Sequence, residues 1–272
     1  MNDARLPLLV EPQQLSTVLK EANLLIVDLC KPETYAQGHI PGAVHLDYKQ
    51  IIAARPPVMG LVPDSDHLSR LMSLVGAKPE THIVAYDDEG GGRAARFLYT
   101  LDIIGHAHYS LLNGGIHAWT NEGYPLETTV NTRAPSEYPV VLGQNPVATK
   151  DYIMDHLRNG DITLVDARSP AEYKGEKKFA EKAGHIPGAI NLDWITLMDQ
   201  TRNLRLKPES EIRKLLEQCQ IHQDKPAVVY CQTHHRSALV YFALKVLGFS
   251  DVKGYPGSWS EWGNSAETPV ET

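Results

Sequence analysis

A cysteine and an arginine separated by four residues stand near the carboxyl-terminal end of the chain, at positions 231 and 236. The cysteine follows the apolar run 227–230, and the arginine precedes the helix-like run 237–244, an order typical of a buried strand, a short loop and a helix start. The backbone N–H groups of such a loop and the positive end of the helix dipole stabilise a thiolate, and Arg236 adds a full positive charge. The pattern therefore predicts a nucleophilic thiolate at Cys231.

An internal duplication places this loop in a larger context. Residues 27–35 reappear as residues 165–173, and the string Gly-His-Ile-Pro-Gly-Ala at 38–43 reappears at 184–189. Between these two matches the second copy carries eight extra residues, in the lysine- and glutamate-rich stretch 174–183. A repeat this long indicates two homologous domains rather than a solenoid, whose units are shorter. We expect the insertion to be a surface loop.

Each copy alternates short apolar runs with helix-like runs. The apolar runs are residues 24–28 and 82–86 in the first copy and residues 162–166 and 227–230 in the second. Strands that alternate with helices predict an α/β fold, in which each copy is a mostly parallel sheet flanked by helices. Ligands normally bind at the carboxyl ends of such strands, which is where Cys231 lies.

Length and composition fit two soluble domains of ordinary size. The predicted domains are residues 1–127 and 147–272, and the polar, proline-bearing stretch 128–146 is the predicted linker. A net charge of −7 argues against nucleic acid or an anionic membrane as the main partner. The first residues lack the apolar segment of a signal peptide, and no stretch approaches a membrane span. We therefore expect a cytoplasmic protein.

The two copies differ at the position that decides the chemistry. Tyr86 aligns with Tyr230, so Asp87 takes the place of Cys231. The first loop, residues 87–93, is one residue longer and carries three carboxylates, which would repel an anionic substrate. Its three consecutive glycines lack the Lys-Ser/Thr of a phosphate-binding loop. We predict that the first domain is catalytically inactive.

The chain resembles the two-domain rhodaneses, the thiosulfate sulfurtransferases, along nearly its whole length. The resemblance depends on the Val-Asp strand ends at Asp28 and Asp166, both His-Ile-Pro-Gly-Ala turns, and residues 257–262. The string Cys-Gln-Thr-His-His-Arg-Ser is similar to the loop of the bacterial branch. The resemblance implies tandem rhodanese domains, with Asp87 marking the inactive one and a persulfide intermediate on Cys231.

The residue types support this mechanism. The Cys231 thiolate can attack the outer sulfur of thiosulfate and release sulfite, as in thiol–disulfide exchange. Backbone N–H groups of the loop can then hydrogen-bond the terminal sulfur of the persulfide. A thiophilic acceptor such as cyanide takes that sulfur in a double displacement. Cys231 is the predicted catalytic residue, and the predicted substrate- or persulfide-binding residues are Gln232, Thr233, His234, His235, Arg236 and Ser237.

The loop departs from other branches of the family. Thiosulfate-using vertebrate members have a lysine where this chain has Thr233, and an arginine where it has Glu172. Both cations attributed to sulfonate binding are therefore missing. The loop is also unlike the Cys-Gly-Ser/Thr-Gly of the mercaptopyruvate-using branch. The sequence thus predicts sulfur transfer, while the physiological donor stays open.

Three side chains near the predicted site have two interpretations each. His234 and His235 either attract the donor and move protons, or shape the loop through hydrogen bonds. Trp194, which follows the second His-Ile-Pro-Gly turn, either lines the entrance to the site or is an ordinary core or interface aromatic. The residue types alone leave these alternatives open.

The remaining cysteines and histidines indicate structure rather than chemistry. Cys30 and Cys219 are expected to be small buried apolar residues. His39 and His185 begin the repeated turns, one of them in the inactive copy, which favours a structural role. The three cysteines have no C-x-x-C spacing, so we predict neither a disulfide framework nor a metal site, and no cofactor.

Two alternative functions come from other classes. Phosphatases with the same fold have a Cys-to-Arg loop one residue longer, which makes room for a phosphate. The four residues between Cys231 and Arg236 suit a single sulfur atom better. The other alternative is a sulfur carrier that delivers the Cys231 persulfide sulfur to a protein acceptor. Turnover with cyanide, compared with transfer to proteins, distinguishes carrier from enzyme.

Overall fold

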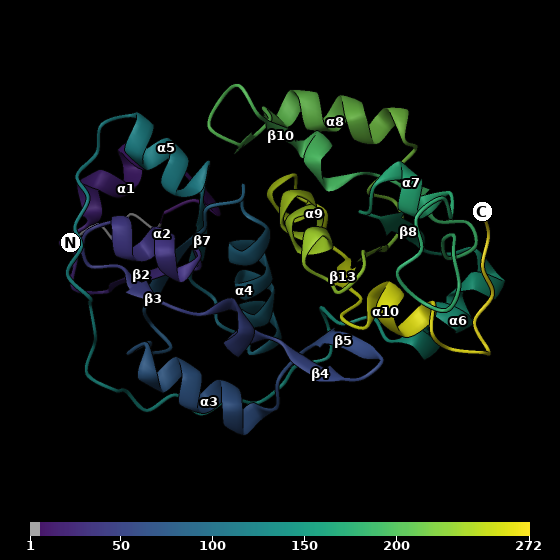
Figure 1. The fold of residues 1–272 in the computed structure, drawn as a ribbon, viewed down its shortest axis with the longest axis horizontal. Coiled ribbons are helices and arrows are strands. Elements are labelled where there is room, and N and C mark those ends of the chain that lie inside the picture. Colours follow the sequence, from purple (N-terminus) through teal and green to yellow (C-terminus); the bar gives the residue numbers. More distant parts are fainter. Residues whose placement is uncertain (1–5) are drawn as a thin grey trace. The chain divides into compact units, whose positions relative to one another are not determined.

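A computed structural model describes residues 6–272, so part of the segment considered above for a signal peptide lies outside the described residues. The chain forms two compact units (Figure 1). Unit 1 consists of the chain up to Ile51, Pro63–Gly143 and Asp199–Leu206, and unit 2 consists of Ile52–Val62, Gln144–Met198 and Lys207–Thr272.

Within the described residues, unit 1 is built on a five-stranded parallel sheet with the order β1-β7-β6-β2-β3. Its strands are β1 (Leu9–Val10), β2 (Leu24–Asp28), β3 (Val44–His45), β6 (His82–Tyr86) and β7 (Tyr109–Leu112). The two longest strands, β2 and β6, coincide with the apolar runs of the first copy. Their near-continuous apolar character is typical of parallel strands that are covered on both faces.

Helices cover both faces of this sheet. They are α1 (Pro12–Val18), α2 (Pro32–Gln37), η1 (Tyr48–Ile51, a 3₁₀ helix), α3 (Ser65–Leu74), α4 (Gly92–Ile103) and α5 (Gly115–Asn121). On one face, Leu15 of α1 and Trp119 of α5 form a buried cluster with Ile26 and Val84 of the sheet. Side chains alternate between the two faces along a strand, and α4 packs against β6 and β7.

Unit 2 repeats this design with a parallel sheet that has the order β13-β12-β8-β9 in the part of the chain that the structure describes. The strands are β8 (Thr163–Asp166), β9 (Ile190–Asn191), β12 (Ala227–Tyr230) and β13 (Val252–Gly254). A parallel bridge between Val147 and Gly254 stands where unit 1 has its β1–β7 pairing. Cys231 follows directly on β12, a central strand.

The helices of unit 2 are α6 (Lys150–Asn159), α7 (Pro170–Tyr173), η2 (Trp194–Leu197, 3₁₀), α8 (Glu209–Gln218), α9 (Arg236–Val246) and α10 (Ser258–Trp262). The helix after the cysteine loop, α9, is apolar on nearly all sides and packs against β12 and β13. A helix of this kind is stable only when buried. Its burial fixes the position of the loop that precedes it.

The duplication extends to individual contacts. The ring of His39 stacks on Tyr35 with centroids 3.7 Å apart, and Nδ1 of His39 lies 2.9 Å from the Tyr35 carbonyl oxygen. In unit 2 the ring of His185 stacks on Tyr173 at 3.6 Å, and its Nδ1 lies 2.8 Å from the Tyr173 carbonyl oxygen. Because the copy that has Asp87 in place of the cysteine keeps the same geometry, the contacts favour the structural role predicted for both histidines.

Each unit also includes a segment from the other half of the sequence. The hairpin of β4 (Ala53–Arg55) and β5 (Val58–Leu61) belongs to unit 2 and lies beside α10 (Figure 1). The segment Asp199–Leu206, which contains β11 (Arg205–Leu206) and the end of β10 (Met198–Asp199), belongs to unit 1. Domains taken as continuous stretches of sequence did not anticipate this exchange.

The predicted fold class is confirmed: both units are parallel sheets flanked by helices. None of the helices among residues 6–272 combines the length and apolarity needed to cross a membrane.

Candidate active site

Cys231 lies at the carboxyl end of β12, and its side chain is 1% exposed. The start of α10 holds the backbone on either side of it. The Cys231 carbonyl accepts the N–H of Trp259 at 2.9 Å, and the Cys231 N–H donates to Oγ of Ser258 at 3.3 Å. The next carbonyl, that of Gln232, accepts the N–H of Ser260 at 3.0 Å. The carbonyls thus point toward α10, which leaves the loop's N–H groups for the sulfur side.

Two consecutive residues give the loop its concave shape. His234 has a φ of 54°, which is the left-handed region that non-glycine residues rarely adopt. His235 follows in the right-handed region, with φ −89° and ψ −63°. Alternation of these two conformations turns successive N–H groups toward one point and forms an anion-binding nest. The backbone of the Cys231 loop therefore has the conformation of a nest at His234 and His235.

The surroundings of Cys231 favour its thiolate. Complete burial raises the pKa of the thiol, but the charge of Arg236 and hydrogen bonds from the Ser237 hydroxyl, the Ser237 N–H and the Thr233 N–H together lower the pKa below its ordinary value. Burial and the neighbouring Asp28 carboxylate raise the pKa of Cys30 far above that value. Of the chain's three cysteines, Cys231 is the one suited to nucleophilic attack.

Arg236 is held in place by a carboxylate. Its two terminal nitrogens donate to the two carboxylate oxygens of Glu172, at 2.6 and 2.8 Å. Burial opposes ionisation of Glu172, yet the pair with Arg236 and the hydrogen bonds from Ser169 hold its pKa at about 2. Glu172 was identified from sequence only as the place of a missing cation. The structure shows that it orients the arginine of the loop.

The two loop histidines have different surroundings. His234 is fully buried, and its Nδ1 lies 2.8 Å from Oγ of Ser237, the residue whose hydroxyl contacts the Cys231 sulfur. His235 is half-buried, and its ring centroid lies 5.8 Å from that of Trp194. Trp194 is itself half-buried, so the structure places it beside the loop rather than deep in the core.

The corresponding loop of unit 1 shows what such a cradle holds. Oδ1 of Asp87 accepts the N–H groups of Glu89 and Gly91 at 3.0 and 2.8 Å, and its Oδ2 accepts the N–H of Ala94 at 2.9 Å. Ala94 is the counterpart of Ser237 in the repeat. Unit 1 therefore fills its own ring of N–H groups with the carboxyl group of Asp87, whose pKa is raised by burial.

The hairpin β4–β5 reaches the loop of Cys231. Gly60 has a φ of +75°, and a Cβ at this position would lie 2.1 Å from the carbonyl oxygen of Thr233. Next to it, the Met59 N–H donates to Oγ of Ser260 at 3.0 Å. Gly60 was not predicted as a site residue, because no local signal in the sequence marks its contact. The roles of Ser258 and Ser260 were not predicted either, although both lie in the motif at 257–262.

The insertion of the second copy reaches the loop as well. Nε2 of Gln232 donates to the carbonyl oxygen of Phe179 at 3.1 Å. The predicted site residues Gln232 to Ser237 are thus all in the loop or its helix start, but three segments distant in sequence contact them. These segments contain Gly60, Glu172 and Phe179.

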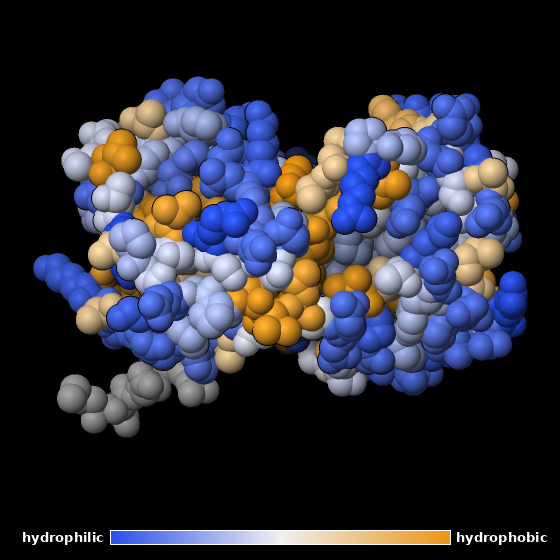
Figure 2. All heavy atoms as spheres, turned by 90° about the horizontal axis from the view of Figure 1, so that it is seen from below, coloured by the Kyte–Doolittle hydropathy of each residue, from blue (hydrophilic) through white to orange (hydrophobic). Residues whose placement is uncertain are grey.

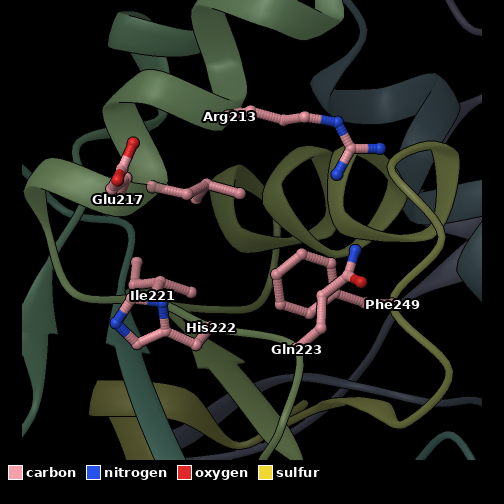
Figure 3. A pocket seen from close by; sticks show the side chains of 7 residues that line it. Arg213, Glu217, Ile221, His222, Gln223 and Phe249 are labelled. Carbon is pink, nitrogen blue, oxygen red and sulfur yellow. The ribbon is translucent and has the colours of Figure 1, made fainter.

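Hollows elsewhere on unit 2 do not contain the predicted site residues. One, of about 330 Å³, lies between α8 and the loop that follows it (Figure 3). There Arg213 of α8 and Gln223 of the loop after it both donate to the carbonyl oxygen of Leu247 at 2.9 Å, so their polar groups join α8 and this loop to the end of α9. Its lining residues are Arg213, Leu216, Glu217, Ile221, His222, Gln223 and Phe249. Across residues 6–272 no group of three histidine, cysteine or acidic side chains is placed to hold a metal ion.

The fold and this loop agree with a known family. The rhodanese-like domain matches the chain twice, over residues 11–122 and 149–265. The chain therefore belongs to the rhodanese-like domain family, as the sequence motifs predicted.

Individual relatives share nearly the whole chain. A thiosulfate sulfurtransferase from Pseudomonas aeruginosa is 46% identical over 266 residues, which cover 98% of this chain and 97% of that protein. The sulfur carrier protein TtuD from Thermus thermophilus is 36% identical, and the alignment covers 87% of this chain and 86% of TtuD. Among solved structures, SseA from Escherichia coli is similar to this chain, with a TM-score of 0.84 at 25% identity. SseA is described as having the rhodanese fold of 3-mercaptopyruvate sulfotransferases, and the match covers 93% of this chain and 99% of the SseA chain.

Proposed function

We propose that this protein is a thiosulfate sulfurtransferase that moves a sulfane sulfur from thiosulfate to a thiophilic acceptor through a persulfide on Cys231. The observation that carries the proposal is the loop of unit 2, where a buried cysteine with a lowered pKa faces a ring of N–H groups. The name of the Pseudomonas aeruginosa relative supports the same activity.

The first half-reaction forms the persulfide. The Cys231 thiolate attacks the outer sulfur of thiosulfate, the S–S bond of thiosulfate breaks, and sulfite leaves with the electron pair. The product is Cys231–S–S⁻, so the total charge is conserved. In the second half-reaction cyanide takes the outer sulfur as thiocyanate, and the Cys231 thiolate is restored.

The loop stabilises the terminal sulfur of this persulfide. N–H groups that already point at the site cost no reorganisation when negative charge develops there. Asp87 supports this role, because the matching loop of unit 1 directs three N–H groups at the oxygens of its carboxyl group. A cradle closed by four residues between Cys231 and Arg236 suits a single sulfur better than a phosphate, which argues against the phosphatase alternative.

We propose that side chains at the rim of the loop bind the sulfur donor, thiosulfate. No lysine stands at Thr233, and the carboxylate of Glu172 is neutralised by Arg236. We assign the sulfonate to the half-buried side chains of the loop, which are Gln232, Thr233 and His235. Their hydroxyl, amide and imidazole groups are hydrogen-bond donors for sulfonate oxygens.

Intact-protein mass spectrometry after incubation with thiosulfate tests the proposal. We expect one added sulfur atom that cyanide removes, and thiocyanate in equal amount. The Cys231→Ser variant should gain no sulfur and show no turnover while keeping the melting temperature of the parent. Sulfur uptake by that variant, or turnover without an added sulfur in the parent, would contradict the assignment of Cys231.

A further inference from the structure

The insertion that distinguishes the second copy from the first is fixed beside the catalytic loop. Its Phe179 carbonyl accepts a hydrogen bond from Gln232, the residue after the nucleophile. Its far end is anchored as well: the N–H of Glu181 donates to Oδ1 of Asn264 at 2.9 Å, and that of Lys182 donates to the carbonyl of Gly263 at 2.8 Å. An eight-residue addition to the active copy alone thus has a defined place next to the site.

The tip of this insertion exposes one aromatic ring and several cations. Phe179 is 61% exposed, and Lys174, Lys177 and Lys178 are exposed too. The stretch 174–183 carries four lysines against two glutamates, in a chain whose net charge is −7. The insertion therefore carries net positive charge in an acidic protein, and its Phe179 contacts the residue after the nucleophile.

Two further exposed apolar side chains belong to segments that contact the same loop. Met59 is 42% exposed, and the residue after it meets the backbone of Thr233. Ile195 is 44% exposed and follows Trp194, whose ring lies beside that of His235. On the face drawn in Figure 2, hydrophobic side chains gather in several groups between hydrophilic ones. Around the loop, three exposed apolar side chains occur on three segments that each contact it.

We infer that Phe179, Met59, Ile195 and the lysines 174, 177 and 178 form an acceptor surface for a protein that presents a cysteine among acidic and apolar residues. The inference rests on the proposed function, because it requires the Cys231 persulfide. An acidic partner is repelled by the net charge of −7 but attracted by the local lysines, which steer it to the loop. An exposed aromatic ring is a typical anchor of such contacts.

The transfer itself needs no further reagent. The acceptor thiolate attacks the outer sulfur of Cys231–S–S⁻, and a new S–S bond forms on the acceptor. The S–S bond to Cys231 breaks, and its Sγ leaves as a thiolate with the electron pair. The acceptor ends as a persulfide anion, and oxidation state and charge are conserved.

Two synthetic peptides of equal length test the inference, each with one cysteine, flanked either by aspartate and leucine or by lysine and leucine. The full-length protein is loaded with thiosulfate, freed of excess donor and mixed with each peptide, and sulfur transfer is followed by mass spectrometry. We expect the acidic peptide to react about tenfold faster at low salt, and the advantage to shrink as salt screens the charges.

Matched variants locate the effect. Lys177→Glu/Lys178→Glu should abolish the preference for the acidic peptide, and Phe179→Ala should slow transfer to both peptides about fivefold. Two control variants change exposed positions outside the acceptor surface: Lys214→Glu on α8 and Leu74→Ala on α3. They should change neither the preference for the acidic peptide nor the rate of transfer. The reaction of the loaded persulfide with cyanide should be equal in all of them, since cyanide needs no docking surface.

Equal rates for both peptides in the parent protein would overturn the inference. The inference would also be overturned if the Lys177→Glu/Lys178→Glu variant formed the persulfide from thiosulfate more slowly but transferred its sulfur to both peptides as the parent does. The lysines would then serve the anionic donor. Failure of the proposed function is a distinct result, since no persulfide would form on Cys231 in the parent.

Discussion

The same side chain behaves in opposite ways at two places in this protein. Cys30 and Cys231 are both buried, and burial alone raises the pKa of each thiol. The nearby carboxylate of Asp28 raises the pKa of Cys30 further. In contrast, the charge of Arg236 and the hydrogen-bond donors of its own loop lower the pKa of Cys231. Reactivity is therefore decided by the sign of the neighbouring charge and by the direction of the nearest N–H groups.

Removal of the loop arginine tests this electrostatic argument. Persulfide formation requires the thiolate, so its rate falls as the pH decreases through the lowered pKa of Cys231. In Arg236→Ala that pKa rises, and the midpoint of the pH–rate profile should move upward by about one unit or more. Single-turnover rates with thiosulfate measure it, and Arg236→Lys should restore part of the difference. An unmoved midpoint would show that the charge of Arg236 does not act on the sulfur.

The partner of this arginine predicts a pH-dependent stability. The pKa of Glu172 is about 2 in the folded protein and 4.5 ordinarily. A lowered pKa contributes stability that is complete above pH 4.5 and is lost as the pH falls toward 2. Glu172→Gln should therefore cost about 2 kcal/mol of unfolding free energy at neutral pH, and this difference should shrink as the pH falls. Denaturant titrations at several pH values measure it, with Glu211→Gln on α8 as the exposed control. A difference that stays constant with pH would contradict the assigned ion pair.

At the scale of elements, the hairpin β4–β5 is the least expected part of the site. It lies between two elements of the first half of the sequence, yet its Gly60 approaches the carbonyl of Thr233 so closely that no side chain fits. Since α10 binds the loop carbonyls and also Met59, the hairpin and α10 support the loop together. A cradle for one sulfur atom requires this rigidity, because its N–H groups must keep their direction.

Gly60→Ala is expected to disturb this support. The added Cβ would meet Thr233, so we expect kcat to fall about tenfold, equivalent to about 1.4 kcal/mol in the barrier, with a smaller change in KM. Gly188→Ala is the matched control: its φ of +71° carries the same backbone strain, but nothing lies within 4 Å of its Cβ. Steady-state kinetics compare the two. Equal losses in both variants would mean that backbone strain alone, and not the contact with Thr233, matters.

At the scale of the whole molecule, duplication has produced two cradles with different contents. One copy closes its N–H ring on the carboxylate of Asp87, and the other leaves the ring to the sulfur of Cys231. The carboxylate satisfies buried N–H groups that would otherwise have no acceptor. Asp87 thus stabilises the fold of unit 1 by accepting these hydrogen bonds.

Asp87→Ala separates the two roles. We expect sulfur transfer to stay within about twofold of the parent, while the unfolding free energy falls by about 2 kcal/mol because buried N–H groups lose their acceptor. Asp87→Asn, which keeps one oxygen, should lose less. Thermal denaturation and turnover at a temperature well below unfolding measure both effects. A large loss of turnover in the folded variant would mean that unit 1 takes part in the chemistry.

The sequence by itself determined the repeat and the α/β class, and it predicts the nucleophile and the inactive copy. Each of these depends on neighbours along the chain: a Cys-to-Arg loop between a strand and a helix is a local arrangement, and so is the change from cysteine to aspartate. Such patterns can be read from the sequence because a strand, helix or loop is formed by consecutive residues of suitable types. The division into two units built on parallel sheets follows from the same patterns.

Only the tertiary structure decided which distant residues support the loop. Glu172 pairs with Arg236 across 64 residues, Phe179 meets Gln232 across 53, and Gly60 reaches Thr233 from the other half of the chain. No spacing or residue type announces these contacts, since each arises where the folding of sheets and helices brings separate surfaces together. The exchanged segments have the same origin: contacts, rather than order along the chain, assign them to a unit.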